Sequence, residues 1–204
     1  TGRMAQTSLR LAVLIDADNA SYQIADGLFE EIAQLGEASI RRIYGDFSST
    51  NLKGWSERLS KHAIVPQQQF AYTQGKNASD ITMVIDAMDI LHSGRVDGFC
   101  LVSSDSDFTR LASRIREQGL DVYGFGESKT PESLRQACKR FIFTENLIAS
   151  ETSVSKVRDA IPILLKAIEQ GGGEDGWSHL GSVGALLPKL SSDFDPRSYG
   201  HRKL

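Results

Sequence analysis

Short apolar runs alternate with amphipathic segments between residues 10 and 143, as repeated βαβ units require. Continuous apolar runs over residues 11–15 and 98–102 predict central parallel strands that are buried on both faces. Further strands are predicted over residues 39–44, 121–125 and 141–143, and residues 63–65 should begin another strand or extended segment. Helices are predicted over residues 21–35, 51–61, 78–92, 108–118 and 131–138. The pattern therefore predicts an α/β domain with a Rossmann-like, mostly parallel sheet of five or six strands and helices on both faces.

The segment over residues 78–92 has the clearest helical spacing in the chain. The apolar stripe that should face the sheet consists of Ile81, Val84, Ile85, Met88 and Leu91. Asp80 lies in the first turn, four residues before Val84, so we expect its carboxylate to point toward the sheet.

The composition changes after residue 148. Residues 149–155 are small and polar, which predicts a linker. Residues 156–169 predict a helix that the glycines at 171–173 end, and shorter helical pieces follow. We assign Trp177 to the core of this segment, because a lone tryptophan in a short domain is usually needed for packing. The predicted organisation is a tail (1–9), an α/β domain (10–148), a linker (149–155) and a small helical module (156–204).

Acidic residues follow the two central strands. Asp16 comes directly after the first apolar run, and Asp105 and Asp107 follow the second. Ligands collect at the carboxyl ends of parallel strands, so these acids should converge if the two strands are neighbours, with Asp80 close by. Carboxylates packed together repel one another unless a cation lies among them. A hard divalent cation with oxygen ligands, Mg²⁺ or Mn²⁺, is the natural occupant.

Such a cation would suit phosphodiester chemistry, because it polarises the phosphate, neutralises developing charge and generates hydroxide from bound water. A structural alternative exists for some of the acids. Aspartate is a favoured helix cap and is stabilised in a first turn, which could account for Asp18, Asp80 or Asp107. Asp16 and Asp105 are harder to explain in this way, since a charge that ends a buried strand costs energy without a partner.

Composition narrows the class of protein. The chain of 204 residues is 40% hydrophobic and 24% charged, which is ordinary for a soluble globular protein. Cys100 and Cys138 form no C-x-x-C pair and are interpreted as reduced thiols, which indicates a cytoplasmic location. No apolar stretch approaches the roughly 18 residues that span a membrane. The net charge of −3 gives no argument for nucleic acid, and the sequence leaves homo-oligomerisation open.

Several motifs occur in the order and spacing of a known family. They are Leu14-Ile15-Asp16-Ala17-Asp18-Asn19, Gly75-Lys76-Asn77-Ala78-Ser79-Asp80, Ile85-Asp86-Ala87-Met88-Asp89, Ser103-Ser104-Asp105-Ser106-Asp107-Phe108, Tyr123-Gly124-Phe125-Gly126 and Thr130-Pro131. Over roughly residues 10–148 the chain resembles the NYN domain family, in its bacterial LabA-like branch. The resemblance implies a PIN-like fold that cleaves RNA with acidic residues and a divalent metal. By position it makes Asp16, Asp80, Asp105 and Asp107 the catalytic, metal-binding acids, and Asn19 the polar residue after the first strand.

The C-terminal segment resembles a second family. Asp175-Gly176-Trp177-Ser178, Leu180-Gly181 and the run from Asp193 to Gly200 are similar to a LOTUS (OST-HTH) module, a winged-helix-like fold associated with RNA. The resemblance implies a partial module, because the family would continue beyond Leu204 into a last helix and wing. Its candidate RNA contacts form a basic and aromatic group, Arg197, Tyr199, Arg202 and Lys203.

We therefore expect a metal-dependent endoribonuclease that hydrolyses RNA phosphodiester bonds and carries a C-terminal RNA-binding module. Candidate substrate-binding residues are Asn19, Lys76, Arg197 and Tyr199. Further basic candidates are Arg110, Arg114, Arg135, Lys139 and Arg140. The main alternative is a non-catalytic RNA- or protein-binding module in which the acids only cap helices or hold metal. A haloacid-dehalogenase-type phosphatase is less favoured, because its motif needs Thr or Val where this chain has Ala20.

Overall fold

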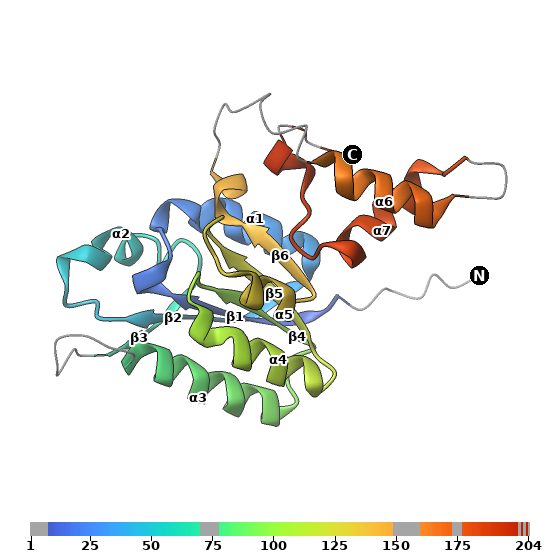
Figure 1. Cartoon of the computed structure of the whole chain (residues 1–204). Helices are drawn as coiled ribbons and strands as arrows, with labels where there is room; N and C mark the ends of the chain where they lie inside the picture. The colour runs from blue at the N-terminus through green and yellow to red at the C-terminus, as the bar shows by residue number, and fades with distance from the viewer. Residues whose placement is uncertain are drawn as a thin grey trace, which may run out of the picture.

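A six-stranded sheet forms the centre of the molecule (Figure 1). The computed structural model describes residues 8–69, 78–148, 160–172, 177–199, 201 and 203. All strand pairs are parallel, in the order β3-β2-β1-β4-β5-β6. The strands are Arg10–Asp16 (β1), Glu37–Gly45 (β2), Val65–Gln68 (β3), Gly98–Val102 (β4), Asp121–Gly126 (β5) and Arg140–Phe143 (β6). This confirms the predicted parallel sheet, and it makes β1 and β4 the central neighbours.

Helices cover both faces of the sheet, as predicted (Figure 1). One face packs on Ala25–Leu35 (α1) and Lys53–Ser56 (α2), and the other on Ala78–Ser93 (α3), Thr109–Glu117 (α4) and Glu132–Ala137 (α5). Successive side chains of a strand point to opposite faces, so β1 contributes to both cores. Leu11, Val13 and Ile15 enter the core under α1, and Ala12 and Leu14 enter the core under α3 and α4.

The apolar stripe predicted for α3 was partly wrong. The buried positions include Met83, Ala87 and Ile90, whereas Ile81 and Ile85 are 58% and 56% exposed. Apolar residues occupy two neighbouring rows of this helix, and the row that packs on the sheet contains the smaller side chain of Ala87. Sequence spacing alone did not separate the two rows, since both have helical periodicity.

The helix predicted over residues 51–61 is also shorter than expected. Regular α-helix ends at Ser56, and turns follow. The indole of Trp55 is almost fully buried and donates a hydrogen bond to the Ala20 carbonyl at 2.8 Å. This contact holds α2 against the segment between β1 and α1. Ala63 then has a φ of 50°, a left-handed conformation that turns the chain toward β3.

The C-terminal part is a small helical unit. It contains Ile161–Gly171 (α6), Leu180–Leu190 (α7) and a 3₁₀ turn, Pro196–Tyr199 (η7). Its core consists of Ala160, Ala167, Val183, Leu187 and Phe194. Trp177 is 81% exposed, so its assignment to this core was wrong. None of the described helices has the length and apolar character that crossing a membrane requires.

The C-terminal unit is docked on the last strand of the sheet. The backbone N–H of Phe141 in β6 donates to the carbonyl of Ser192 at 2.7 Å. The Ser192 hydroxyl donates to the Arg135 carbonyl at 2.9 Å, and Arg135 forms an ion pair with Asp193. These contacts cover part of the exposed edge of β6, which would otherwise present unpaired backbone groups.

Candidate active site

The carboxyl ends of β1 and β4 form the centre of the candidate site. Ile15 pairs with Val102 across the two strands, so Asp16 and Ser103 come at neighbouring strand ends. Asp16 is 1% exposed, and its Oδ2 accepts hydrogen bonds from the Ser103 hydroxyl at 2.7 Å and the Asn19 amide at 2.8 Å. Asp16 Oδ1 is buried and has no hydrogen-bond partner among the described residues. Burial raises the pKa of Asp16, since water no longer solvates the charged form.

Ser103 connects Asp16 to the loop that carries the other acids. The Ser103 hydroxyl, while donating to Asp16, accepts the backbone N–H of Asp105 at 3.1 Å. Asp105 Oδ1 in turn accepts the backbone N–H of Asp107 at 2.9 Å, which caps the 3₁₀ turn Ser106–Phe108. One hydroxyl group therefore contacts both the carboxylate of Asp16 and the backbone N–H of Asp105. Asp107 follows in the exposed first turn.

Asp80 lies close enough to the other acids to respond to their charges. Burial, followed by the negative charges of Asp16, Asp105, Asp107 and Asp18, raises the pKa of Asp80 to about 6. Asp18 contributes to the same cluster, although it was not among the acids predicted to bind metal. Because Asp18 lies only two residues after Asp16, the sequence could have indicated that it joins the cluster. The cluster thus joins acids from the ends of β1 and β4 and from the first turn of α3.

The raised pKa of Asp80 has a measurable consequence for stability. Without metal, the folded protein binds the Asp80 proton more tightly than the unfolded chain, in which the pKa is near 3.8. The free energy of unfolding in EDTA should therefore fall as the pH rises from about 4 to about 6, and then level off. The Asp80→Asn variant should lose this part of the pH dependence. Denaturation of both proteins across this pH range measures the difference, and identical profiles would contradict the raised pKa.

The donor set suits a hard divalent cation. All candidate ligands are carboxylate oxygens, which hard cations prefer. The buried Oδ1 of Asp16 accepts no hydrogen bond from the described residues, so it is free to bind a cation. A cation would also offset the repulsion that raises the pKa of Asp80. In the part of the chain that the structure describes, no three histidine, cysteine, aspartate or glutamate side chains are gathered tightly enough to hold a metal. The chemistry of the residues fits a cation, but the side chains are not arranged as a finished coordination shell.

A cleft of about 370 Å³ opens beside the acids. Its lining includes Asp18, Asn19 and Ser104 on the side of the acids, and Tyr22 and Lys129 farther along. Asn19 therefore has two contacts with the site, because its amide holds Asp16 and its surface lines the cleft. Lys129 pairs with Glu127 at 2.6 Å and is otherwise exposed. Tyr22 and Lys129 belong to no motif, so their place beside the acids could not be predicted from the sequence.

Other candidate residues have different positions. Lys76 lies outside the described residues. Asp86, which belongs to one of the family motifs, accepts hydrogen bonds from Arg42 and from the Tyr44 hydroxyl, both at 2.8 Å. This cluster fastens α3 to β2. Tyr199 packs on Phe194 with ring centroids 5.6 Å apart, so its ring is used within the C-terminal unit.

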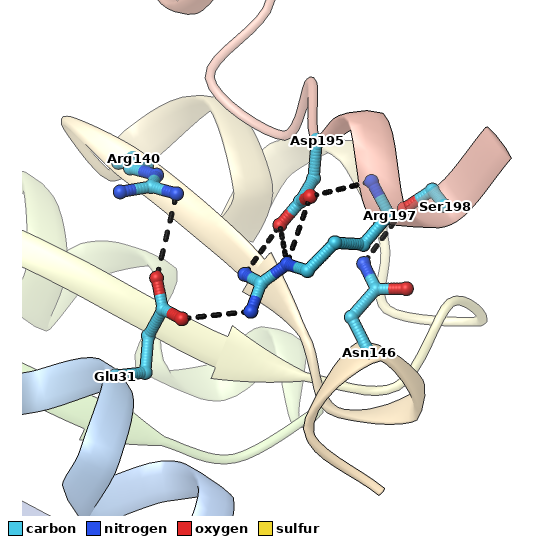
Figure 2. A network of polar contacts seen from close by, with 6 residues as sticks. All are labelled: Glu31, Arg140, Asn146, Asp195, Arg197 and Ser198. Atoms are coloured by element: carbon cyan, nitrogen blue, oxygen red, sulfur yellow. Dashed lines mark hydrogen bonds and ion pairs between the residues drawn. The ribbon is translucent and has the colours of Figure 1, made fainter. Parts of the chain in front are cut away.

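Arg197 is engaged in a network between the two parts of the chain (Figure 2). Its guanidinium reaches Glu31 of α1 at 2.8 Å and Asp195 at 2.6 Å, and both carboxylates are buried. Arg140 approaches the other oxygen of Glu31 at 3.5 Å, and Asn146 donates to the Ser198 hydroxyl at 2.8 Å. The pKa of Arg197 is raised, chiefly by its hydrogen bonds to Asp195. The structure therefore gives Arg197 a docking contact inside the protein, and its contact with RNA stays a prediction.

Close packing around Gly126 supports the position of Ser103. A Cβ at Gly126 would lie 2.9 Å from the Ser103 carbonyl oxygen and 2.8 Å from the Phe141 ring. The Gly126→Ala variant should therefore lose about 1–3 kcal/mol of stability, because the neighbouring backbone cannot move aside cheaply. Gly181→Ala in α7 is the matched control, since nothing lies within 4 Å of its added Cβ and alanine favours helix. Urea denaturation compares the two, and equal stabilities would contradict the packing argument.

Comparison with known proteins identifies two segments. A family model described as NYN domain matches residues 10–149, and one described as OST-HTH/LOTUS domain matches residues 152–204. No curated protein matches the chain significantly. Among solved structures, a protein of unknown function from Vibrio parahaemolyticus has 19% identity and a TM-score of 0.57, covering 68% of this chain and 94% of its own. The WlbA dehydrogenase from Bordetella pertussis has 17% identity and a TM-score of only 0.38, covering 83% of this chain and 42% of its own.

Proposed function

Because this chain belongs to the NYN domain family, whose fold is of the PIN-like nuclease type, we propose that it is a divalent-metal-dependent endoribonuclease. It would hydrolyse RNA phosphodiester bonds and use its OST-HTH/LOTUS domain to bind RNA. The observation that carries the proposal is the buried carboxylate of Asp16. One of its oxygens is held by Ser103 and Asn19, and the other is left without a partner beside further acids.

Asp16, Asp80, Asp105 and Asp107 are the residues that would hold Mg²⁺ or Mn²⁺ in this proposal. When bound, the cation supplies charge neutralisation at the phosphate and lowers the pKa of a water molecule. The protein contributes orientation, because Ser103 and Asn19 fix the Asp16 carboxylate before any substrate arrives. A bound cation would also hold Asp80 as its carboxylate, because it opposes the repulsion that helps to raise the pKa of Asp80 to about 6 without metal.

A non-catalytic RNA- or protein-binding module is the second candidate function. The observation in its favour is that the acids of the described residues do not already form a metal-binding group. In that case Asp105 would serve mainly as the cap of the turn that follows it. The family match gives no support to a phosphatase of the haloacid-dehalogenase type.

The test is direct cleavage of labelled single-stranded RNA by the full chain. We expect internal cleavage in Mn²⁺ or Mg²⁺ and none when EDTA is added. RNA labelled at its 5′ end distinguishes internal cuts from removal of terminal nucleotides. RNA that is bound but remains intact in both metals would overturn the nuclease proposal and favour the non-catalytic module.

A further inference from the structure

A groove lies between the α/β domain and the docked C-terminal unit. It has a volume of about 510 Å³ and is lined from both sides. Arg116 at the end of α4 and Lys139 just before β6 come from the domain, while Lys189 comes from the last turn of α7. Part of the remaining wall is apolar, including Ala185 and Pro188. All three cationic side chains belong to exposed residues.

The groove is a concentration of positive charge on a chain whose net charge is −3. Among the residues that the structure describes, none of those lining the groove is acidic. Lys139 pairs with Asp121 at 2.7 Å, and Arg116 has a long hydrogen bond of 3.4 Å to the Ala137 carbonyl. Among the described residues, no carboxylate lies within ion-pair distance of Arg116 or Lys189 at 4.0 Å or less. Two of the three charges therefore remain available to an anion.

The groove lies at the edge of the sheet opposite to the acids. Arg116 and Lys139 precede the starts of β5 and β6, whereas Asp16 and Asp105 follow the ends of β1 and β4. Strands of five or six residues separate these edges by roughly 15–20 Å, at about 3.3 Å per residue. A ligand that used both places would have to be an extended polyanion. An isolated phosphate or a mononucleotide could occupy only one of them.

We propose that this groove binds the phosphodiester backbone of single-stranded RNA at a distance from the cleaved bond. The inference rests on the proposed ribonuclease function for the identity of the polyanion, but its charge and position come from the groove itself. Arg116, Lys139 and Lys189 contact phosphates, and the groove adds affinity without taking part in bond cleavage. Lys189 is contributed by the docked unit, so the site is complete only while the Ser192–Phe141 contact holds that unit in place.

The test uses two triple variants of the full chain with the same change in charge. The groove variant carries Arg116→Gln, Lys139→Gln and Lys189→Gln. The control variant carries Lys53→Gln, Arg95→Gln and Lys166→Gln, which replace exposed cations that do not line the groove. Binding of a fluorescent single-stranded RNA of about 20 nucleotides is measured in EDTA at several salt concentrations, so that no cleavage is needed.

The groove variant should bind at least about 10-fold more weakly near 0.1 M salt, and the slope of log affinity against log salt should become less negative by about 2. The control variant should change much less. Equal losses in the two variants would show general electrostatic attraction and overturn the groove. Competition by polyglutamate as strong as that by RNA would also overturn it, in favour of an acidic protein partner. Equally strong displacement by inorganic phosphate or a mononucleotide would contradict the proposal that the groove binds an extended RNA backbone.

A separate measurement distinguishes this proposal from the nuclease proposal. If the wild type cleaves RNA in Mn²⁺, the groove variant should raise KM and leave the rate at saturating RNA unchanged. If the wild type does not cleave RNA but the groove variant still weakens binding selectively, the nuclease proposal fails and the groove stands. If the groove variant binds RNA with wild-type affinity, the groove proposal is wrong, whatever the cleavage assay shows.

Discussion

The Asp105→Asn variant is expected to cleave RNA about 100- to 1,000-fold more slowly than the wild type, with no loss of folding stability. Asparagine caps a helical turn as well as aspartate, so the hydrogen bond from the Asp107 amide at 2.9 Å should survive. The lost negative charge should weaken metal binding. It should also relieve the repulsion that helps to raise the pKa of Asp80 to about 6.

Two measurements on the same protein test this expectation. Single-turnover cleavage at saturating RNA in Mn²⁺ gives the chemical rate, and urea denaturation in EDTA gives the stability. Asp89→Asn is the matched control, because Asp89 is an exposed acid on α3 and does not act on the pKa of Asp80. Cleavage at the wild-type rate would remove Asp105 from the mechanism. An unfolded Asp105→Asn protein would show that folding needs the charged carboxylate itself, which would contradict the expected stability.

The sheet and the position of the acids could be predicted from sequence because both follow local rules. The continuous apolar runs at residues 11–15 and 98–102 require burial on both faces, which places these strands at the centre of a parallel sheet. Their ends then lie at one edge, and this accounts for the approach of Asp16 and Asp105 through Ser103. The geometry of a bound metal could not be predicted in the same way. It depends on side-chain conformations that no spacing rule fixes.

The errors arose where the decisive partner is distant in sequence or where two patterns are equivalent. Ile81 and Ile85 have the same helical period as the row that packs on the sheet, so only tertiary contacts choose between the rows. The docking contact of Arg197 could not be predicted either, because its partner Glu31 is 166 residues away, and its role in RNA binding stays a prediction. Trp177 was assigned by a general rule about lone tryptophans in short domains, and the core instead contains Phe194 as its aromatic residue.

The Arg197→Ala variant is expected to release the C-terminal unit from the α/β domain. It would leave the buried carboxylates of Glu31 and Asp195 without their main cation, and only Arg140, at 3.5 Å, would remain near Glu31 (Figure 2). Removing one partner of a buried ion pair costs about 3 kcal/mol, since the desolvated charge that remains is uncompensated. Urea denaturation should show this loss, whereas Arg95→Ala, at an exposed position, should show almost none.

Amide hydrogen exchange can locate the loss at the docking contact. The Phe141 N–H donates to Ser192 of the docked unit, while the neighbouring Lys139 N–H donates to Val122 inside the sheet. Release of the unit should therefore speed exchange at Phe141 and leave Lys139 protected. Equal protection of Phe141 in wild type and variant would show that Arg197 does not hold the unit in place. Faster exchange at both amides would mean that the sheet itself had been destabilised, so that the effect of Arg197 extends beyond docking.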